Sequence, residues 1–155
     1  MKISTFVSGT AGAAAMAMGA LAVAPPASAT APTTATVQVK CGYWGTGTAT
    51  LQAQHNGRVA TVSFSTPVVW ASHSTPANSL QTTMTLSTAS GKEVTLSGKA
   101  NPAWTLIGQP YASGPVTGAV TPGEALQFTS ITSTIGGVTV HCDAISPQSP
   151  GPFVF

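Results

Sequence analysis

The stretch TVQVKC (residues 36–41) alternates apolar and polar side chains and ends on a cysteine, and VTVHC (residues 138–142) repeats the pattern about a hundred residues later. Side chains two positions apart in a strand share a face, so each cysteine faces the same way as the two valines before it. Cys41 and Cys142 are the only cysteines in the chain. We therefore expect them to form one disulfide, inside the fold, that joins the first and last strands.

The N-terminal residues 1–29 have the features of a signal peptide. Lys2 is followed by an apolar run over residues 7–23, and the sequence ASA that ends at Ala29 has the form that signal peptidase cleaves. A membrane anchor is the weaker interpretation, because the run is rich in Gly and Ala and falls short of the roughly 20 apolar residues of a span. No second apolar span follows. We expect a mature chain of about 126 residues, secreted or attached to the cell envelope, where disulfides persist.

Charged residues make up only 5% of the chain, and beyond the leader the two signs nearly balance. The charged side chains there are Lys40, Arg58, Lys92, Lys99, Glu93, Glu124 and Asp143. No basic stripe is present to collect phosphates, which argues against nucleic acid as a partner. The polar surface must come from Ser, Thr, Gln and Asn, and the many Thr and Val residues favour strands.

The clearest local signal is a hairpin. TATLQAQ (residues 48–54) and VATVSFS (residues 59–65) both alternate, and Asn56-Gly57 between them is the preferred centre of a two-residue turn. A change of phase along residues 125–135 predicts a bulge near Ser130. Other strands are expected at residues 36–41, 68–73, 79–88, 92–98, 103–108, 125–135 and 138–142.

Seven to nine short antiparallel strands separated by turn signals predict an all-β domain, and we expect an immunoglobulin-like β-sandwich. Residues 30–36 are expected to be a flexible lead-in, residues 37–146 the sandwich, and residues 147–155 a loose Pro-rich tail. Residues 109–123 are rich in Pro and Gly and are expected to be a long connection with at most one short strand near Val116.

The leader ends in APPASA (residues 24–29), the domain opens with VKC (residues 39–41), HC (residues 141–142) lies near its close, and a Pro- and Gly-rich tail follows. In these features the chain resembles the small secreted β-sandwich proteins of actinobacteria, many of which are domains of unknown function. The resemblance implies an exported β-domain and no particular activity. The chromoprotein apoproteins and subtilisin inhibitors of such bacteria usually carry two disulfides, so no functional residues are carried over from them.

The sequence offers little for catalysis, and we expect no enzyme, no metal and no cofactor. A Ser–His–Asp triad would use His55, His73 or His141 with Asp143, but no G-x-S-x-G segment is present to position a nucleophile. The histidines are too far apart in sequence for the usual paired zinc ligands. His141 and Asp143 alternate outward on the last strand, so we expect them to touch at the surface.

Aromatic side chains are the better indication of a binding site. Continued alternation after the first strand would place Tyr43 inward and Trp44 outward, and Tyr111 lies in the Pro- and Gly-rich connection. Exposed Trp and Tyr stack on sugar rings or anchor protein partners, so Trp44 and Tyr111 are the candidate ligand-binding residues, and a place in the core is the equal alternative for both. Trp70 and Trp104 are in phase with apolar neighbours and are expected in the core.

Together these features favour a secreted, non-enzymatic protein that binds a cell-envelope glycan or another surface protein through loops and exposed aromatic residues. A structural or self-associating surface protein is the alternative, because low net charge weakly favours association. A protease inhibitor or hydrolase is a minority alternative.

Overall fold

A computed structural model of the chain describes residues 30–71, 74–102, 107–135 and 137–155. The leader expected over residues 1–29, together with His73 and Trp104, lies outside these described residues. Within them, no helix has the length and apolar character needed to span a membrane.

The described residues form strands and one short 3-10 helix. In chain order the elements are β1 (Thr34–Lys40), η1 (Gly42–Trp44), β2 (Thr46–Asn56), β3 (Val59–Trp70), β4 (Gln81–Ser87), β5 (Glu93–Gly98), β6 (Pro110–Ala119), β7 (Ala125–Ile135), β8 (Val138–Ala144) and β9 (Phe153–Val154).

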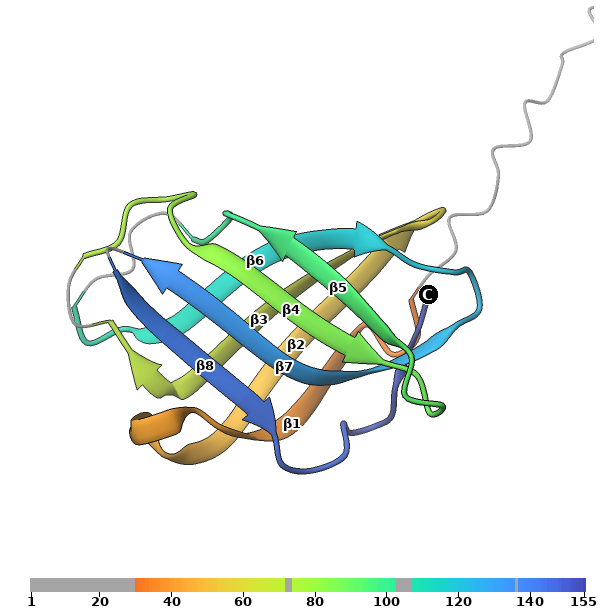
Figure 1. Cartoon of the computed structure of the whole chain (residues 1–155), viewed down its shortest axis with the longest axis horizontal. Coiled ribbons are helices and arrows are strands. Elements are labelled where there is room, and N and C mark those ends of the chain that lie inside the picture. Colours follow the sequence, from red (N-terminus) through yellow and green to blue (C-terminus); the bar gives the residue numbers. More distant parts are fainter. Residues whose placement is uncertain (1–29, 72–73, 103–106, 136) are drawn as a thin grey trace, which may run out of the picture.

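The first eight strands close into an antiparallel barrel. Around the ring the order is β1, β2, β3, β6, β5, β4, β7 and β8, and the pairs β1–β8 and β4–β7 close it. Figure 1 shows β4, β5, β7 and β8 crossing steeply over the strands of the opposite wall. The all-β class is confirmed, whereas the expected immunoglobulin-like sandwich is corrected to a barrel. The reason is that β4 pairs with β7 along its whole length, which joins what would otherwise be two sheets.

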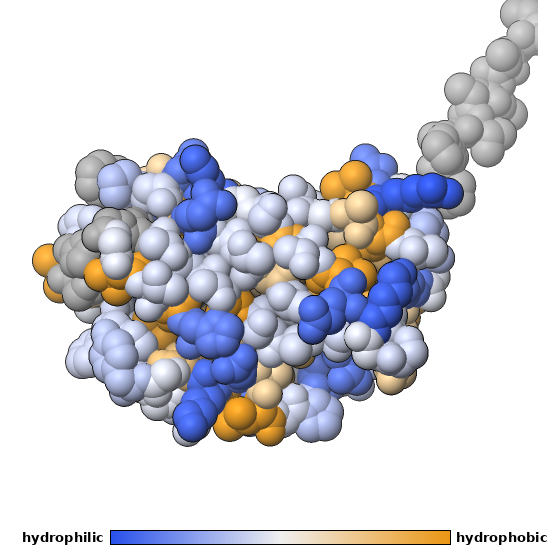
Figure 2. All heavy atoms as spheres, viewed as in Figure 1, coloured by the Kyte–Doolittle hydropathy of each residue, from blue (hydrophilic) through white to orange (hydrophobic). Residues whose placement is uncertain are grey.

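Alternation sorts the side chains between the inside and the outside of this barrel. β1 alternates exposed and buried residues at every position. The interior is filled with apolar side chains such as Leu51, Phe64, Met84 and Leu126, and burying each one contributes about 1.5–3 kcal/mol. The outward positions carry mainly Thr, Ser and Gln, so the visible face in Figure 2 is largely pale, with scattered strongly hydrophilic residues.

Two local predictions are confirmed. β2 and β3 form the expected hairpin, although its two loop residues are Gly57 and Arg58, one position later than predicted, because Asn56 still pairs with Val59. Gly57 has a φ of 59°, which glycine adopts without strain. The bulge expected near Ser130 appears as a register shift between β4 and β7 next to that residue.

The prediction that Trp70 lies in the core was wrong, because β3 changes phase after Pro67. Thr66 and Val69 are buried, whereas Trp70 is 59% exposed. The β3–β6 pairing shifts register between Thr66 and Trp70. Proline cannot donate to the ladder and is found at such irregularities, so the unbroken alternation assumed from the sequence does not hold here.

The Pro- and Gly-rich segment expected as a connection contains β6, a ten-residue strand. Its glycines allow close approach of neighbouring backbone: a Cβ added at Gly118 would lie 2.6 Å from the carbonyl oxygen of Thr95 in β5. At Gly114 the backbone leaves the regular ladder, and its N–H donates to the carbonyl of Ala100 instead. The glycines that suggested a loop therefore allow this strand to lie close to the backbone of its neighbours.

The tail over residues 147–155, expected to be loose, is packed against one end of the barrel. Phe153 pairs with Leu126 of β7, and both Phe153 and Phe155 are buried. The side-chain amide oxygen of Gln148 accepts a hydrogen bond from the backbone N–H of Phe128 at 3.1 Å. The two phenylalanines provide enough apolar burial to order a segment whose prolines suggested an extended, free chain.

The lead-in over residues 30–36 is likewise ordered. β1 already begins at Thr34, and Ala31 pairs with Val154 of β9. Thr30 is buried, and its hydroxyl lies 2.9 Å from Nδ1 of His55. Both ends of the described chain therefore lie at the same end of the barrel.

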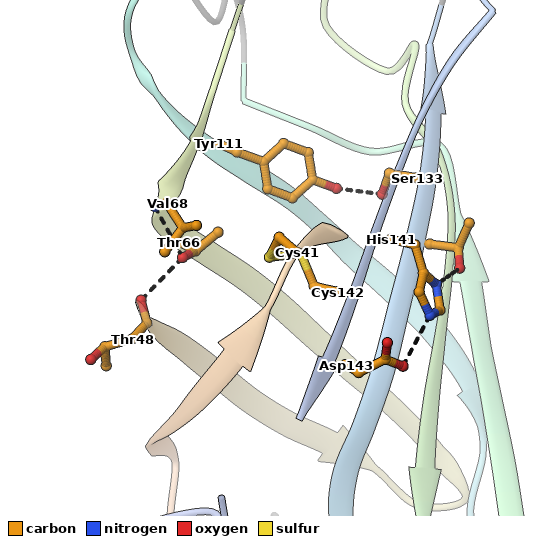
Figure 3. Close-up of a disulfide and its surroundings, with 10 residues drawn as sticks. Cys41, Thr48, Thr66, Val68, Tyr111, Ser133, His141, Cys142 and Asp143 are labelled. Atoms are coloured by element: carbon orange, nitrogen blue, oxygen red, sulfur yellow. Dashed lines mark hydrogen bonds and ion pairs between the residues drawn. A yellow bond between two sulfur atoms is a disulfide. The ribbon is translucent and has the colours of Figure 1, made fainter. Parts of the chain in front are cut away.

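The predicted disulfide between Cys41 and Cys142 is present and buried. Cys41 directly follows β1, and Cys142 lies in β8, the last strand of the barrel. β1 and β8 pair at only two positions, Val39 with Ala144 and Lys40 with Asp143. The disulfide therefore links the chain across the junction where the first and last barrel strands meet (Figure 3).

Candidate binding surface

The turn CGYWG (residues 41–45) places two aromatic side chains just after the disulfide cysteine. Gly42 and Gly45 have φ angles of 55° and 98°, and the backbone N–H of Cys41 donates to the carbonyl of Gly45 at 2.8 Å. Strand alternation therefore ends at Cys41. The expected orientations are reversed: Tyr43 is 83% exposed, while Trp44 is half-buried and packs against the core.

Trp44 lies in the middle of a row of aromatic rings. Its ring centroid is 4.7 Å from that of Tyr43 and 6.2 Å from that of Trp70, which it meets edge to face. Beyond the rings, Ile107 is 69% exposed. We call Tyr43, Trp44, Trp70 and Ile107 the aromatic end of the barrel. Exposed apolar side chains are informative when they cluster, because clusters mark interaction sites.

Two hollows flank Trp44. The apolar hollow has a volume of about 320 Å³ and is lined by Trp44, Trp70, Ala71, Ile107 and Gly108. The polar hollow has a volume of about 300 Å³, and the residues that line it include Lys40, Tyr43, Trp44, Thr139, His141 and Asp143. Trp44 thus belongs to both hollows, one of which offers only apolar contact and the other hydrogen-bonding groups.

A hydrogen-bonded chain of three side chains borders the polar hollow. Nδ1 of His141 lies 2.7 Å from the hydroxyl of Thr132, and Nε2 lies 2.9 Å from Oδ1 of Asp143 (Figure 3). The predicted surface contact of His141 with Asp143 is confirmed. The order hydroxyl, imidazole, carboxylate is that of a hydrolytic triad. His141 and Asp143 are, however, more than half exposed on the outer wall, and Thr132 is not among the residues that line the hollow.

Tyr111, the other candidate ligand-binding residue, points into the barrel. It is 8% exposed, and its hydroxyl donates to Oγ of Ser133. Ser133 and Ser113 in turn lie 2.7 and 2.6 Å from the hydroxyl of Thr82, which makes a buried cluster of four hydroxyl groups. Burial raises the pKa of Tyr111. Figure 3 shows its ring directed toward Ser133, and Tyr111 is not among the residues that line either hollow at the aromatic end.

The other titratable groups are dispersed. His55 contacts Thr30, and Glu124 accepts a hydrogen bond from Lys92 at 2.9 Å, which lowers the pKa of that carboxyl group. Among the described residues, no three His, Cys, Asp or Glu side chains are grouped so that they could hold a metal ion.

The sequence interpretation missed several members of the site, including Tyr43, which it expected to face inward. Trp70 was assigned to the core, Ile107 was assigned to an ordinary strand, and Lys40 was counted only as a charge. Pro67 was the available signal for Trp70, since a proline inside a β run marks a bulge or an irregular edge. No comparable signal existed for Ile107, whose position depends on how the barrel end is assembled.

Comparison with known proteins adds no assignment to this geometry: no protein-family model, no curated protein and no solved structure matches the chain. The chemistry of the two hollows and of the rings between them is therefore the basis for assigning a function.

Proposed function

We propose that this protein is a secreted, non-enzymatic binding module and that the aromatic end is its ligand-binding surface. The observation that carries the proposal is the row Tyr43, Trp44 and Trp70, in which two rings are more than half exposed beside two hollows. Exposed aromatic rings cost free energy in water unless a partner covers them. The leader sequence and the buried disulfide support an oxidising compartment outside the cytoplasm.

A glycan of the cell envelope is the ligand that fits this surface best. The apolar faces of sugar rings stack on Trp and Tyr, and their hydroxyl groups need hydrogen-bonding partners nearby. Asp143, His141 and Thr139 provide such partners in the polar hollow. Only Lys40 and Asp143 carry formal charges there, one of each sign, so the surface favours a polar ligand over a strongly charged polymer.

Retention on insoluble cell-wall polysaccharide tests the proposal. Tyr43→Ala and Trp70→Ala remove exposed rings and should lower retention at least several-fold while the thermal unfolding temperature changes little. Val59→Ala is the matched control, because Val59 is an exposed apolar residue beside the β2–β3 turn and away from the aromatic end. Equal retention of all four proteins, or no retention of the wild type, would contradict the proposal.

Self-association is the second candidate, and the exposure of Trp70 and Ile107 on one hollow favours it. Light scattering at high protein concentration distinguishes the two. A dimer that Trp70→Ala dissociates would support self-association, and a strict monomer would exclude it.

A further inference from the structure

Building on this proposed function, we infer that the two hollows beside Trp44 are neighbouring subsites for an oligosaccharide of N-acetylated amino sugars. The acetamido methyl group of one sugar occupies the apolar hollow, and the hydroxyl groups of the adjoining sugar occupy the polar hollow. The Trp44 ring, which lines both, contacts the segment between them.

The apolar hollow selects an uncharged, apolar group. Its walls are two indole rings, the side chains of Ile107 and Ala71 and the backbone of Gly108. Among the described residues that line it, none has a charged side chain, and the indole nitrogens are the only polar side-chain atoms. A carboxylate or ammonium group would lose its hydration there without compensation, whereas a methyl group gains from the transfer. The hollow therefore complements an acetyl group better than a bare hydroxyl or amine.

Trp44 supplies a second, independent observation. Its Nε1 atom is shielded from solvent and has no hydrogen-bond partner in the described structure. A buried donor without a partner is unusual and unfavourable, and it gains an acceptor when ligand binding turns the indole ring so that a ligand oxygen reaches Nε1. An acetamido group carries both a methyl group and a carbonyl oxygen. One substituent thus brings a methyl group for the apolar wall and an acceptor for the indole N–H once the ring has turned.

The polar hollow offers hydrogen-bond donors and acceptors for sugar hydroxyl groups. Oδ1 of Asp143 is engaged by His141 at 2.9 Å, while its second carboxylate oxygen makes no hydrogen bond in the described structure. A carboxylate oxygen is a strong acceptor for a sugar hydroxyl. Lys40 lines the same hollow and forms no ion pair with a described residue, so its ammonium group remains available as a donor.

The test compares three soluble trimers by isothermal titration calorimetry on the disulfide-bonded protein. They are the β-1,4-linked trimers of N-acetylglucosamine, of glucose and of glucosamine, which differ in the acetamido, hydroxyl or ammonium substituent. We expect the N-acetylated trimer to bind about ten-fold more tightly than the glucose trimer, the low end of the effect of one methyl group in an apolar pocket. The glucosamine trimer should bind most weakly.

Variants assign the effect to each hollow. Trp70→Ala alters only the apolar hollow and should abolish the preference for the acetyl group, and Ile107→Ser provides the same test if Trp70→Ala is unstable. Asp143→Asn alters only the polar hollow and should weaken the N-acetylated and glucose trimers by the same factor. Val59→Ala should behave as the wild type.

The outcomes separate the inference from the proposed function. Equal affinity for the acetylated and glucose trimers, or an acetyl preference that survives both Trp70→Ala and Ile107→Ser, would overturn the subsite assignment even if glycans bind. If neither the trimers nor insoluble cell-wall polysaccharide bind, the proposed glycan function fails together with the inference that rests on it. Unchanged affinity of the Tyr43→Ala protein for the trimers would show that this ring, which lines the polar hollow, is not part of the binding surface, and would contradict both the proposed function and the inference that rests on it.

Discussion

Replacing Cys41 and Cys142 by alanine should destabilise this protein more than any other pair of substitutions at the barrel junction. β1 and β8 pair at two positions, whereas β1 pairs with β2 at seven and β8 with β7 at six. Outside the ladder, the segment after β8 adds backbone hydrogen bonds to β1, each 2.8 Å long, from Ile145 to Gln38 and in both directions between Thr36 and Ser149. The disulfide therefore adds a covalent link at the junction where β1 and β8 form only two ladder pairs.

The magnitude follows from the length of the closed loop. The cysteines are 101 positions apart, and the chain-entropy model gives about 4.7 kcal/mol of stabilisation for a loop of that size. Unfolding entropy is about 2.1 cal/mol/K per residue, so for about 126 residues the unfolding temperature should fall by roughly 18 °C. Deleting two buried sulfur atoms adds a smaller cavity cost.

Urea denaturation of three samples separates these contributions: the oxidised wild type, the reduced wild type and the Cys41→Ala/Cys142→Ala variant. Reduction opens the loop but keeps both sulfur atoms inside the barrel. The reduced wild type should therefore lose most of the 4.7 kcal/mol expected from the loop, and the variant should lose the cavity cost in addition.

One result would refute this reasoning. If the reduced wild type unfolds within about 1 kcal/mol of the oxidised protein, the link does not constrain the unfolded chain as the model requires. A large loss in the variant alone would attribute the effect to packing around the sulfurs rather than to loop closure.

Three further predictions follow from burial and charge. Burial raises the pKa of Tyr111 above 10.0, so the stability that the neutral side chain contributes is present below that pH and is lost as the pH rises further. In a Tyr43→Phe background, tyrosinate absorbance should therefore appear only when the protein unfolds in alkali. Ionisation of Tyr111 in the folded protein would contradict this. The hydrogen bond from Lys92 lowers the pKa of Glu124 below 4.5, so its stabilisation is present above pH 4.5 and is lost as the pH falls through the lower pKa of the folded protein. Lys92→Ala should therefore make the unfolding temperature fall less steeply on acidification. An unchanged dependence of the unfolding temperature on pH would argue against a stabilising Lys92–Glu124 interaction. Phe153→Ala should cost about 3–5 kcal/mol in chemical denaturation, whereas a value near zero would mean that the tail is not packed.

The sequence sufficed for the features that depend on local pattern. Alternation predicted which side chains of the β2–β3 hairpin face inward, and the valines before Cys41 and Cys142 placed both sulfurs inside. These predictions succeed because neighbouring side chains in a strand must point to opposite faces whatever the sheet does next.

Closure of the barrel could not be predicted in the same way. Inward and outward alternation is identical in a sandwich and in a barrel, and the decisive β4–β7 pairing joins segments separated by more than forty residues at Thr82 and Ser133. Trp70 lies outside the core in which it was expected, and Tyr111, for which core and surface were both open, lies inside, for related reasons. A proline reset the phase of β3, and a segment read as a loop became β6.

The closed ring also bears on how this chain avoids aggregation. With charged residues at only 5%, electrostatic repulsion between copies is weak. Within the described structure, each strand from β1 to β8 has a partner on both sides, so few backbone groups remain to template the addition of a foreign strand. Its solubility would then depend on the closed topology rather than on charge. Opening the β1–β8 junction would expose the unpaired edges of two strands at once, and strands of other molecules could pair with them.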